Sequence, residues 1–201
     1  MGEKKKIHVL GISSSPRISG NTDLLIDQFL SGARENGAET EKIQLCDFNI
    51  KPCTQCDYCR REGNCIIRDD MQELYPKILT TNCLVLASPI YFMAHCAQAK
   101  LLIDRCQTFW VRSHVLHKPM SPWHILPRKG IFISVGATHG TKVFAGARVT
   151  MKWFFNSLEM EYWANLLIEG VDEKAAIRNH PTALTDAHDL GRKLAYSYSE
   201  S

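Results

Sequence analysis

Hydrophobic residues occur along this chain in two patterns, short continuous runs and stripes with helical spacing. The runs cover residues 7–12, 83–87, 130–135 and 162–168, and a further strand is predicted near residues 40–45. Short apolar runs bounded by turn residues are typical of buried strands. Between them, apolar residues recur every three or four positions, as on the buried face of a helix. Strands alternating with helices through short links predict a single α/β domain over residues 1–201, with a doubly wound, five-stranded parallel sheet.

Composition adds little to this picture. The chain is 45% hydrophobic and 22% charged, with a formal net charge of +3, as in an ordinary globular protein. It has no arginine-rich helix and no interleaved basic and aromatic residues, so we expect no nucleic-acid partner. No apolar run is long enough to span a bilayer, so we expect no membrane partner. Without a recognisable signal peptide, the expected location is the reducing cytoplasm.

The densest chemistry lies in a cysteine-rich segment, residues 46–68. Cys53, Cys56, Cys59 and Cys65 follow the spacing Cys-x2-Cys-x2-Cys-x5-Cys. Thiolates spaced so closely suit the corners of an iron-sulfur cube better than one tetrahedral zinc ion, whose ligands usually fall into two separated pairs. Zinc is the second interpretation, and redox thiols or a loop that binds nothing also remain open. Cys46, Cys83 and Cys106 are expected in the core.

A hydroxyl-rich loop follows the first predicted strand. Residues 13–22 read Ser-Ser-Ser-Pro-Arg-Ile-Ser-Gly-Asn-Thr and lead into a helix. Backbone N–H groups, the helix dipole and hydroxyl donors together favour an anion, and phosphate is the obvious one. The glycine patterns of dinucleotide and triphosphate loops are absent, which favours a single terminal phosphate such as that of FMN. The alternative is a serine-rich turn that only caps the helix.

Two further segments should reach the same edge of the sheet. Ser-Pro-Ile-Tyr-Phe at residues 88–92 follows the third predicted strand, and Gly-Ala-Thr-His-Gly at residues 136–140 follows the fourth. The carboxyl ends of parallel strands meet at one edge, where doubly wound sheets bind ligands. Small residues there allow the backbone to approach a flat ring closely.

A long connection, residues 107–128, separates the third predicted helix from the fourth predicted strand. It contains three histidines and two tryptophans, and prolines 119, 122 and 127 are expected to prevent regular structure. The histidines match no metal-ligand spacing. Trp123 is expected to be either an aromatic wall for a planar substrate or a loop anchor.

Three separate segments carry a family resemblance. Residues 13–22, 88–92 and 97–105 resemble the NADPH-dependent FMN reductase superfamily, and the likeness spans about residues 7 to 140. The cysteine motif between the second strand and the second helix is similar to that of the iron-sulfur flavoproteins of anaerobic microbes. The resemblance implies a flavodoxin-like fold, with residues 46–68 as an inserted cluster loop.

The same resemblance implies the cofactors and their ligands. FMN and a [4Fe-4S] cluster are expected, the latter held by Cys53, Cys56, Cys59 and Cys65. The residues implied at the FMN phosphate are Ser13, Ser15, Arg17, Ser19, Asn21 and Thr22. The residues implied at the isoalloxazine ring are Pro89, Ile90, Tyr91, Phe92 and Gly136. Members of this group form homodimers and homotetramers with flavin sites at subunit interfaces, and the cluster loop is expected near a neighbouring subunit's flavin.

The two motifs together favour an electron relay. A low-potential donor such as ferredoxin would supply electrons through the cluster to FMN and then to a small acceptor. One alternative is an NAD(P)H-dependent FMN, quinone or nitro reductase, in which the cysteines only brace their loop. The other is a carrier or redox sensor without a substrate of its own.

Overall fold

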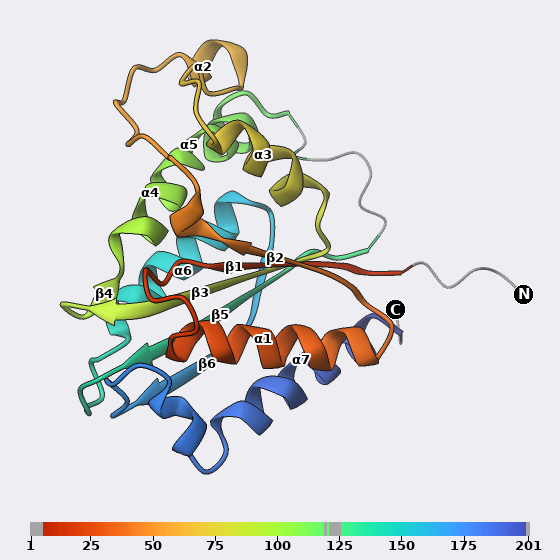
Figure 1. Cartoon of the computed structure of the whole chain (residues 1–201). Coiled ribbons are helices and arrows are strands. Elements are labelled where there is room, and N and C mark those ends of the chain that lie inside the picture. Colours follow the sequence, from red (N-terminus) through yellow and green to blue (C-terminus); the bar gives the residue numbers. More distant parts are fainter. Residues whose placement is uncertain (1–5, 119, 121–125, 200–201) are drawn as a thin grey trace, which may run out of the picture.

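A central parallel sheet organises the protein. The computed structural model describes residues 6–118, 120 and 126–199, and the parallel strands run in the order β2-β1-β3-β5-β6 (Figure 1). They are β1 (His8–Ser13), β2 (Glu39–Gln44), β3 (Cys83–Tyr91), β5 (Lys129–Gly136) and β6 (Glu161–Glu169). The predicted five-stranded parallel sheet is confirmed. An unpredicted two-residue strand, β4 (Ala94–His95), pairs antiparallel with the end of β3.

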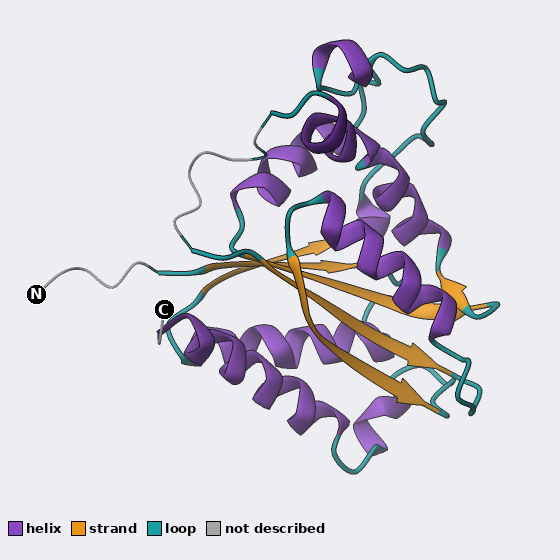
Figure 2. Ribbon diagram, turned by 180° about the vertical axis from the view of Figure 1, so that it is seen from behind, coloured by secondary structure: helices purple, strands orange, loops and turns teal. Residues whose placement is uncertain are grey.

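Helices cover both faces of this sheet (Figure 2). One face carries α1 (Asn21–Glu35) and α7 (Ala183–Ser199), and the other carries α3 (Met71–Thr80), α4 (Ala97–Arg105) and α6 (Ala145–Ser157). Alternate side chains of each strand point to opposite faces. In β3 the even-numbered residues 84 and 86 join the α3/α4/α6 core, and the odd-numbered residues 83, 85 and 87 join the α1/α7 core.

Shorter helical segments lie in the connections. They are η1 (Leu45–Asp47), α2 (Cys59–Glu62), α5 (Gln107–Trp110), η2 (Val111–Val115, π-helical) and η3 (Ala176–Asn179). The expectation that residues 107–128 lack regular structure is therefore wrong for residues 107–115. Those nine residues contain neither proline nor glycine, and the three prolines all come later. Trp123, His124, Pro119 and Pro122 lie outside the described residues.

The strand order reverses direction beside β1. The chain passes from β1 outward to β2 and then returns to the other side of β1 as β3. At such a reversal the loops leaving adjacent strands turn to opposite faces, and open α/β sheets generally bind their ligands there, outside the carboxyl ends of the strands. Across the part of the chain that the structure describes, no helix is long and apolar enough to cross a membrane.

Candidate functional site

The carboxyl rim, where β1, β3 and β5 end, is braced by buried hydroxyl groups. Ser14 donates both its backbone N–H and its Oγ hydroxyl to the carbonyl of Ala87, at 2.9 and 2.8 Å. The Ser134 hydroxyl donates to the carbonyl of Ser88 at 2.6 Å. These bonds join three neighbouring strand ends, so the segments predicted to bind FMN leave from a fixed frame.

The loop of residues 13–22 offers unused polar groups. Ser13 is fully buried, yet its Oγ has no hydrogen-bond partner among the described residues. The backbone N–H of Arg17 donates to Ser15 Oγ at 3.1 Å, and that of Gly20 donates to the Arg17 carbonyl at 2.9 Å. A buried hydroxyl without a partner is costly unless a ligand completes it. Ser13 therefore provides a buried donor that a phosphate could satisfy.

The start of α1 carries an ion pair that the sequence analysis did not identify. The Asp23 carboxylate accepts a hydrogen bond from Ser19 N at 2.7 Å and lies 2.7 Å from Lys42 Nζ. Burial lowers the pKa of Lys42, but hydrogen bonds to Asp23 and Asp27 outweigh it and hold that pKa above its ordinary value. Lys42 therefore stays charged, and it offsets the carboxylate that lies in the first turn of the helix.

Two side chains expected at the phosphate bind protein groups instead. Arg17 Nη1 donates to the Asp172 carbonyl at 3.1 Å. The Asn21 amide donates to the Glu173 carbonyl at 2.9 Å and accepts from Ile177 N at 3.1 Å. Asn21 thus fastens the loop to the segment after β6, and its backbone N–H is what it could offer to a ligand. Arg17 retains further guanidinium N–H groups.

The segment expected beside the flavin ring forms a hairpin. Tyr91 pairs with Ala94, so Phe92 and Met93 make a two-residue connection. Tyr91 is 42% exposed and Phe92 is fully exposed, at 103%. The remaining predicted ring contact, Gly136, ends β5 at the same rim. Its backbone is so close to Val143 that an added Cβ would lie 2.8 Å from Val143 Cγ1, which explains the glycine there by protein packing.

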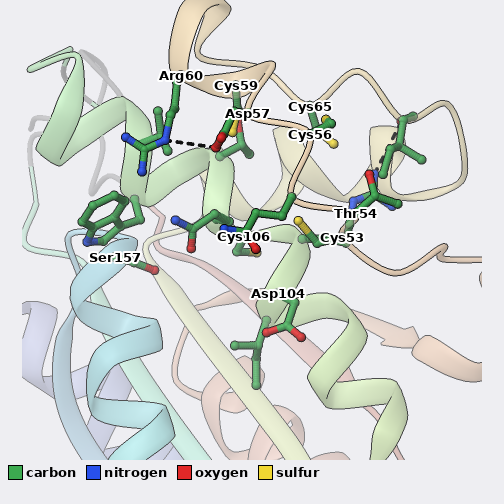
Figure 3. A pocket seen from close by; sticks show the side chains of 18 of the residues that line it. Cys53, Thr54, Cys56, Asp57, Cys59, Arg60, Cys65, Asp104, Cys106 and Ser157 are labelled. Atoms are coloured by element: carbon green, nitrogen blue, oxygen red, sulfur yellow. Dashed lines mark hydrogen bonds and ion pairs between the residues drawn. The ribbon is translucent and has the colours of Figure 1, made fainter.

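The four motif cysteines line one cavity of about 570 Å³ between their loop and the helices α4, α5 and α6 (Figure 3). The residues on either side of Cys56 have left-handed backbone: φ is 51° at Gln55 and 56° at Asp57. Alternating left- and right-handed residues of this kind gather backbone N–H groups toward an anionic centre. The loop of residues 46–68 thus directs its thiols into a common space.

The thiols act on one another electrostatically. Burial raises the pKa of the Cys59 thiol, and the charges of Cys65, Cys53 and Cys56 raise it further. In the described part of the chain, no three ligating side chains converge as a single metal ion requires. A cubane cluster instead spreads its thiolates over four corners, and its ligands are deprotonated when it binds. The spacing, the shared cavity and the all-thiol donor set fit such a cluster.

Two tryptophans also line this cavity, and the sequence analysis did not place either there. Trp110 is half-buried, lines the cavity and stacks on His114 at 5.4 Å between ring centroids. Trp153 of α6 is 64% exposed. Of the remaining cysteines, Cys83 and Cys106 are buried as predicted, whereas Cys46 is exposed, because it lies in η1 where the chain leaves the sheet.

Comparisons with known proteins show the family of this chain. The family model described as NADPH-dependent FMN reductase matches residues 7–162. An iron-sulfur flavoprotein of Methanocaldococcus jannaschii is 30% identical over 93% of this chain and 95% of its own length. An iron-sulfur flavoprotein of Methanosarcina thermophila is 37% identical over 48% of this chain and 51% of that protein.

Solved structures agree on the fold. An NAD(P)H:quinone oxidoreductase from Methanothermobacter marburgensis superposes with a TM-score of 0.70 at 19% identity, covering 94% of this chain and 96% of that one. A flavone reductase superposes with a TM-score of 0.68 at 20% identity over 96% of this chain, which spans 63% of that protein. At these identities the likeness establishes the flavodoxin-like architecture.

Proposed function

The chain belongs to the iron-sulfur flavoproteins of the NADPH-dependent FMN reductase family, and on this premise we propose that it relays electrons from a low-potential, ferredoxin-like donor through a [4Fe-4S] cluster to FMN and on to a small acceptor. The family makes it an FMN-dependent oxidoreductase. The observation that carries the relay is that one chain holds both a phosphate-type loop at the carboxyl rim and four cysteines that line a single cavity. When bound, the two cofactors supply the electron transfer, and the protein supplies position and electrostatics.

FMN binding is proposed at the carboxyl rim. The buried hydroxyl of Ser13, which has no partner among the described residues, the backbone N–H groups of Asn21 and Thr22 at the start of α1 and the Arg17 guanidinium would hold the phosphate. Ser15 and Thr22 would complete this site. Pro89 to Phe92 and the glycine at position 136 would line the ring, with the Tyr91 and Phe92 side chains orienting it.

Cluster binding is proposed at Cys53, Cys56, Cys59 and Cys65, within residues 46–68 of a single 1–201 domain. These thiols must lose their protons to bind iron, and in the free protein burial and the charges of the other three cysteines raise the pKa of Cys59. Positive charges around the loop favour the thiolate forms. Arg60 lines the same cavity and pairs with Asp57 at 3.0 Å, and Arg105 is buried in the cavity wall.

The remaining assignments are also proposals. The fully exposed Phe92 and half-exposed Met93 support a homodimer or homotetramer in which another subunit covers the hairpin. Free cysteines throughout the described residues are in keeping with a cytoplasmic location. NAD(P)H in place of ferredoxin is the alternative donor.

The first test is a measurement of iron, sulfide and FMN per chain after purification without oxygen. We expect about four irons and four sulfides beside one flavin. Cys56→Ala should then abolish flavin reduction by reduced ferredoxin and leave FMN bound, because Cys56 lies in the cysteine loop and not among the rim residues. Cys46→Ala is the matched control, since Cys46 is exposed outside the cavity. Unchanged ferredoxin-dependent reduction in Cys56→Ala would contradict the relay.

A plain NAD(P)H-dependent reductase is the second candidate, and the matched family model favours it. It predicts rapid bleaching of the flavin by NADPH alone, equally fast in wild type and Cys56→Ala. Stopped-flow absorbance distinguishes the two functions. A carrier or sensor, in turn, would show no turnover with an added small acceptor.

A further inference from the structure

One side chain connects the two ends of the cysteine loop. Arg105, the last residue of α4, is 1% exposed. Its Nη1 donates to the Lys51 carbonyl at 2.9 Å and to Asp69 Oδ2, and its Nη2 donates to Asp69 Oδ1 at 3.1 Å and, more weakly, to the Ile67 carbonyl at 3.5 Å. Lys51 comes two residues before the first motif cysteine, and Ile67 two residues after the last. The guanidinium therefore holds together the two stems from which the loop emerges.

Asp69 completes this clamp from the other side. Besides pairing with Arg105, it accepts hydrogen bonds from Lys51 N at 2.8 Å and Met71 N at 3.2 Å. Burial raises the pKa of Asp69, but the hydrogen bonds from Arg105 and Lys51 outweigh it and hold that pKa below its ordinary value. Both partners of the pair therefore remain charged at neutral pH.

Stability alone is a poor explanation for this pair. Its two side chains are 0% and 1% exposed, and a buried ion pair typically adds no more stability than well-packed apolar residues of the same size. What an apolar pair cannot do is bond two separate backbone stems at once. A planar guanidinium with five N–H donors can.

The position of Arg105 points to the thiols. It lies in the wall of the cavity that the four cysteines line. The charge of Cys65 acts on Arg105, and the hydroxyl of Tyr75 donates to the Arg105 carbonyl at 3.0 Å. Arg105 Nε is buried and has no hydrogen-bond partner among the described residues. A positive charge is thus held behind a loop whose four thiolates would carry negative charge.

We propose that Arg105, fixed by Asp69, is a positioning residue for the metal centre: it closes the base of the 51–69 loop before iron binds and places a buried cation behind Cys65. This proposal rests on the proposed function. Gathering four thiols from an open loop costs conformational entropy, and a stem that is already closed lowers that cost. Residues that orient the ligands of a metal typically change its affinity about 10- to 100-fold.

The test compares four variants of the holoprotein purified without oxygen: Arg105→Gln, Arg105→Lys, Asp69→Asn and the control Lys100→Gln. The control removes one positive charge from the exposed side of the same helix, where Lys100 pairs with Asp104. We measure the rate of iron release to a chelator and the midpoint potential of the cluster. Arg105→Gln and Asp69→Asn should release iron about 10- to 100-fold faster than wild type, and Lys100→Gln at the wild-type rate.

The potentials separate positioning from simple loss of stability. Removing the cation in Arg105→Gln should lower the midpoint potential, and removing the carboxylate in Asp69→Asn should raise it. Arg105→Lys should release iron faster while keeping the potential near that of wild type, because lysine keeps the charge but cannot bridge both stems. The proposal would be overturned if Arg105→Gln and Asp69→Asn released iron at the wild-type rate. It would also be overturned if the midpoint potentials of these two variants shifted in the same direction.

A second measurement keeps this inference separate from the proposed function. If wild-type protein contains no iron, the relay fails, but the clamp can still be read in the metal-free protein by hydrogen-deuterium exchange of residues 52–68. Asp69→Asn, which preserves the size of the side chain, should exchange these amides faster than Lys100→Gln. Equal exchange in the two variants would show that the pair does not close the loop.

Discussion

The hairpin between β3 and β4 stores backbone strain that a double substitution should release. Phe92 and Met93 connect the two strands with φ values of 51° and 61°. Two-residue hairpins with positive φ at both positions strongly prefer Asn-Gly, because larger side chains are disfavoured in the left-handed region. The Phe92 side chain is fully exposed, so within one chain no buried apolar contact of this side chain compensates for the strain.

The expected gain follows from three contributions. Left-handed backbone costs about 1–2 kcal/mol per residue, so Phe92→Asn with Met93→Gly should relieve about 2–4 kcal/mol. Glycine has more conformational freedom in the unfolded chain, which reduces this gain in stability by about 1 kcal/mol. Met93 is 48% exposed, and loss of the contacts of its buried half reduces the gain in stability by about 1 kcal/mol more. The double variant should therefore be more stable by about 1 kcal/mol, which raises Tm by about 2–4 °C in a chain of this size.

The assay is urea unfolding of the FMN-free protein, with Tm as a second measure. Val149→Ala is the control, since Val149 is an exposed apolar side chain on regular helix (61% exposed) and its loss should change stability by less than about 0.5 kcal/mol. Turnover of the double variant should fall, because strained residues persist where function requires them. A loss of stability by 1 kcal/mol or more, especially one that depends on protein concentration, would refute the reasoning and show that the hairpin is buried against another subunit.

Two further predictions concern the rim. Ser13→Ala should leave the FMN-free protein at least as stable as wild type, because it removes a buried hydroxyl without a partner, and should weaken FMN binding about 10- to 100-fold, as measured by flavin fluorescence titration. Ser14→Ala is the matched contrast and should destabilise the protein by about 1–3 kcal/mol, because Ser14 Oγ donates a hydrogen bond to the Ala87 carbonyl. If Ser13→Ala binds FMN as tightly as wild type, Ser13 does not belong to the phosphate site. Both ring nitrogens of His95 are buried without a hydrogen-bond partner among the described residues. Burial lowers the pKa of His95, the positive charge of Lys100 lowers it further, and the carboxylate of Asp104 partly opposes this. Because His95 binds a proton more readily in the unfolded chain, wild-type stability should fall as the pH drops below about 6.5. In His95→Leu, the urea midpoint should depend less on pH between pH 5 and 8. An unchanged dependence would show that His95 is not the group responsible.

Local patterns in the sequence determined much of this protein. The five parallel strands, the helical stripes of α1, α3 and α6 and the cysteine motif all follow from spacing over a few residues. The reason is that strand and helix periodicity is set by neighbouring backbone geometry. The chain order of the hydroxyl loop, residues 88–92 and Gly136 also placed them at one rim, because parallel strands share their carboxyl ends.

Tertiary structure decided which distant side chains meet. Arg105 and Asp69 are 36 residues apart, and Lys42 lies 19 residues after its partner Asp23. No periodicity predicts such pairs, since they depend on how α4 packs beneath the cysteine loop and how β2 lies beside α1. The same holds for Trp110, which lies at the end of α5 and lines the cavity of the four cysteines. A repeating pattern specifies which face of an element is buried, whereas packing between elements specifies what that face contacts.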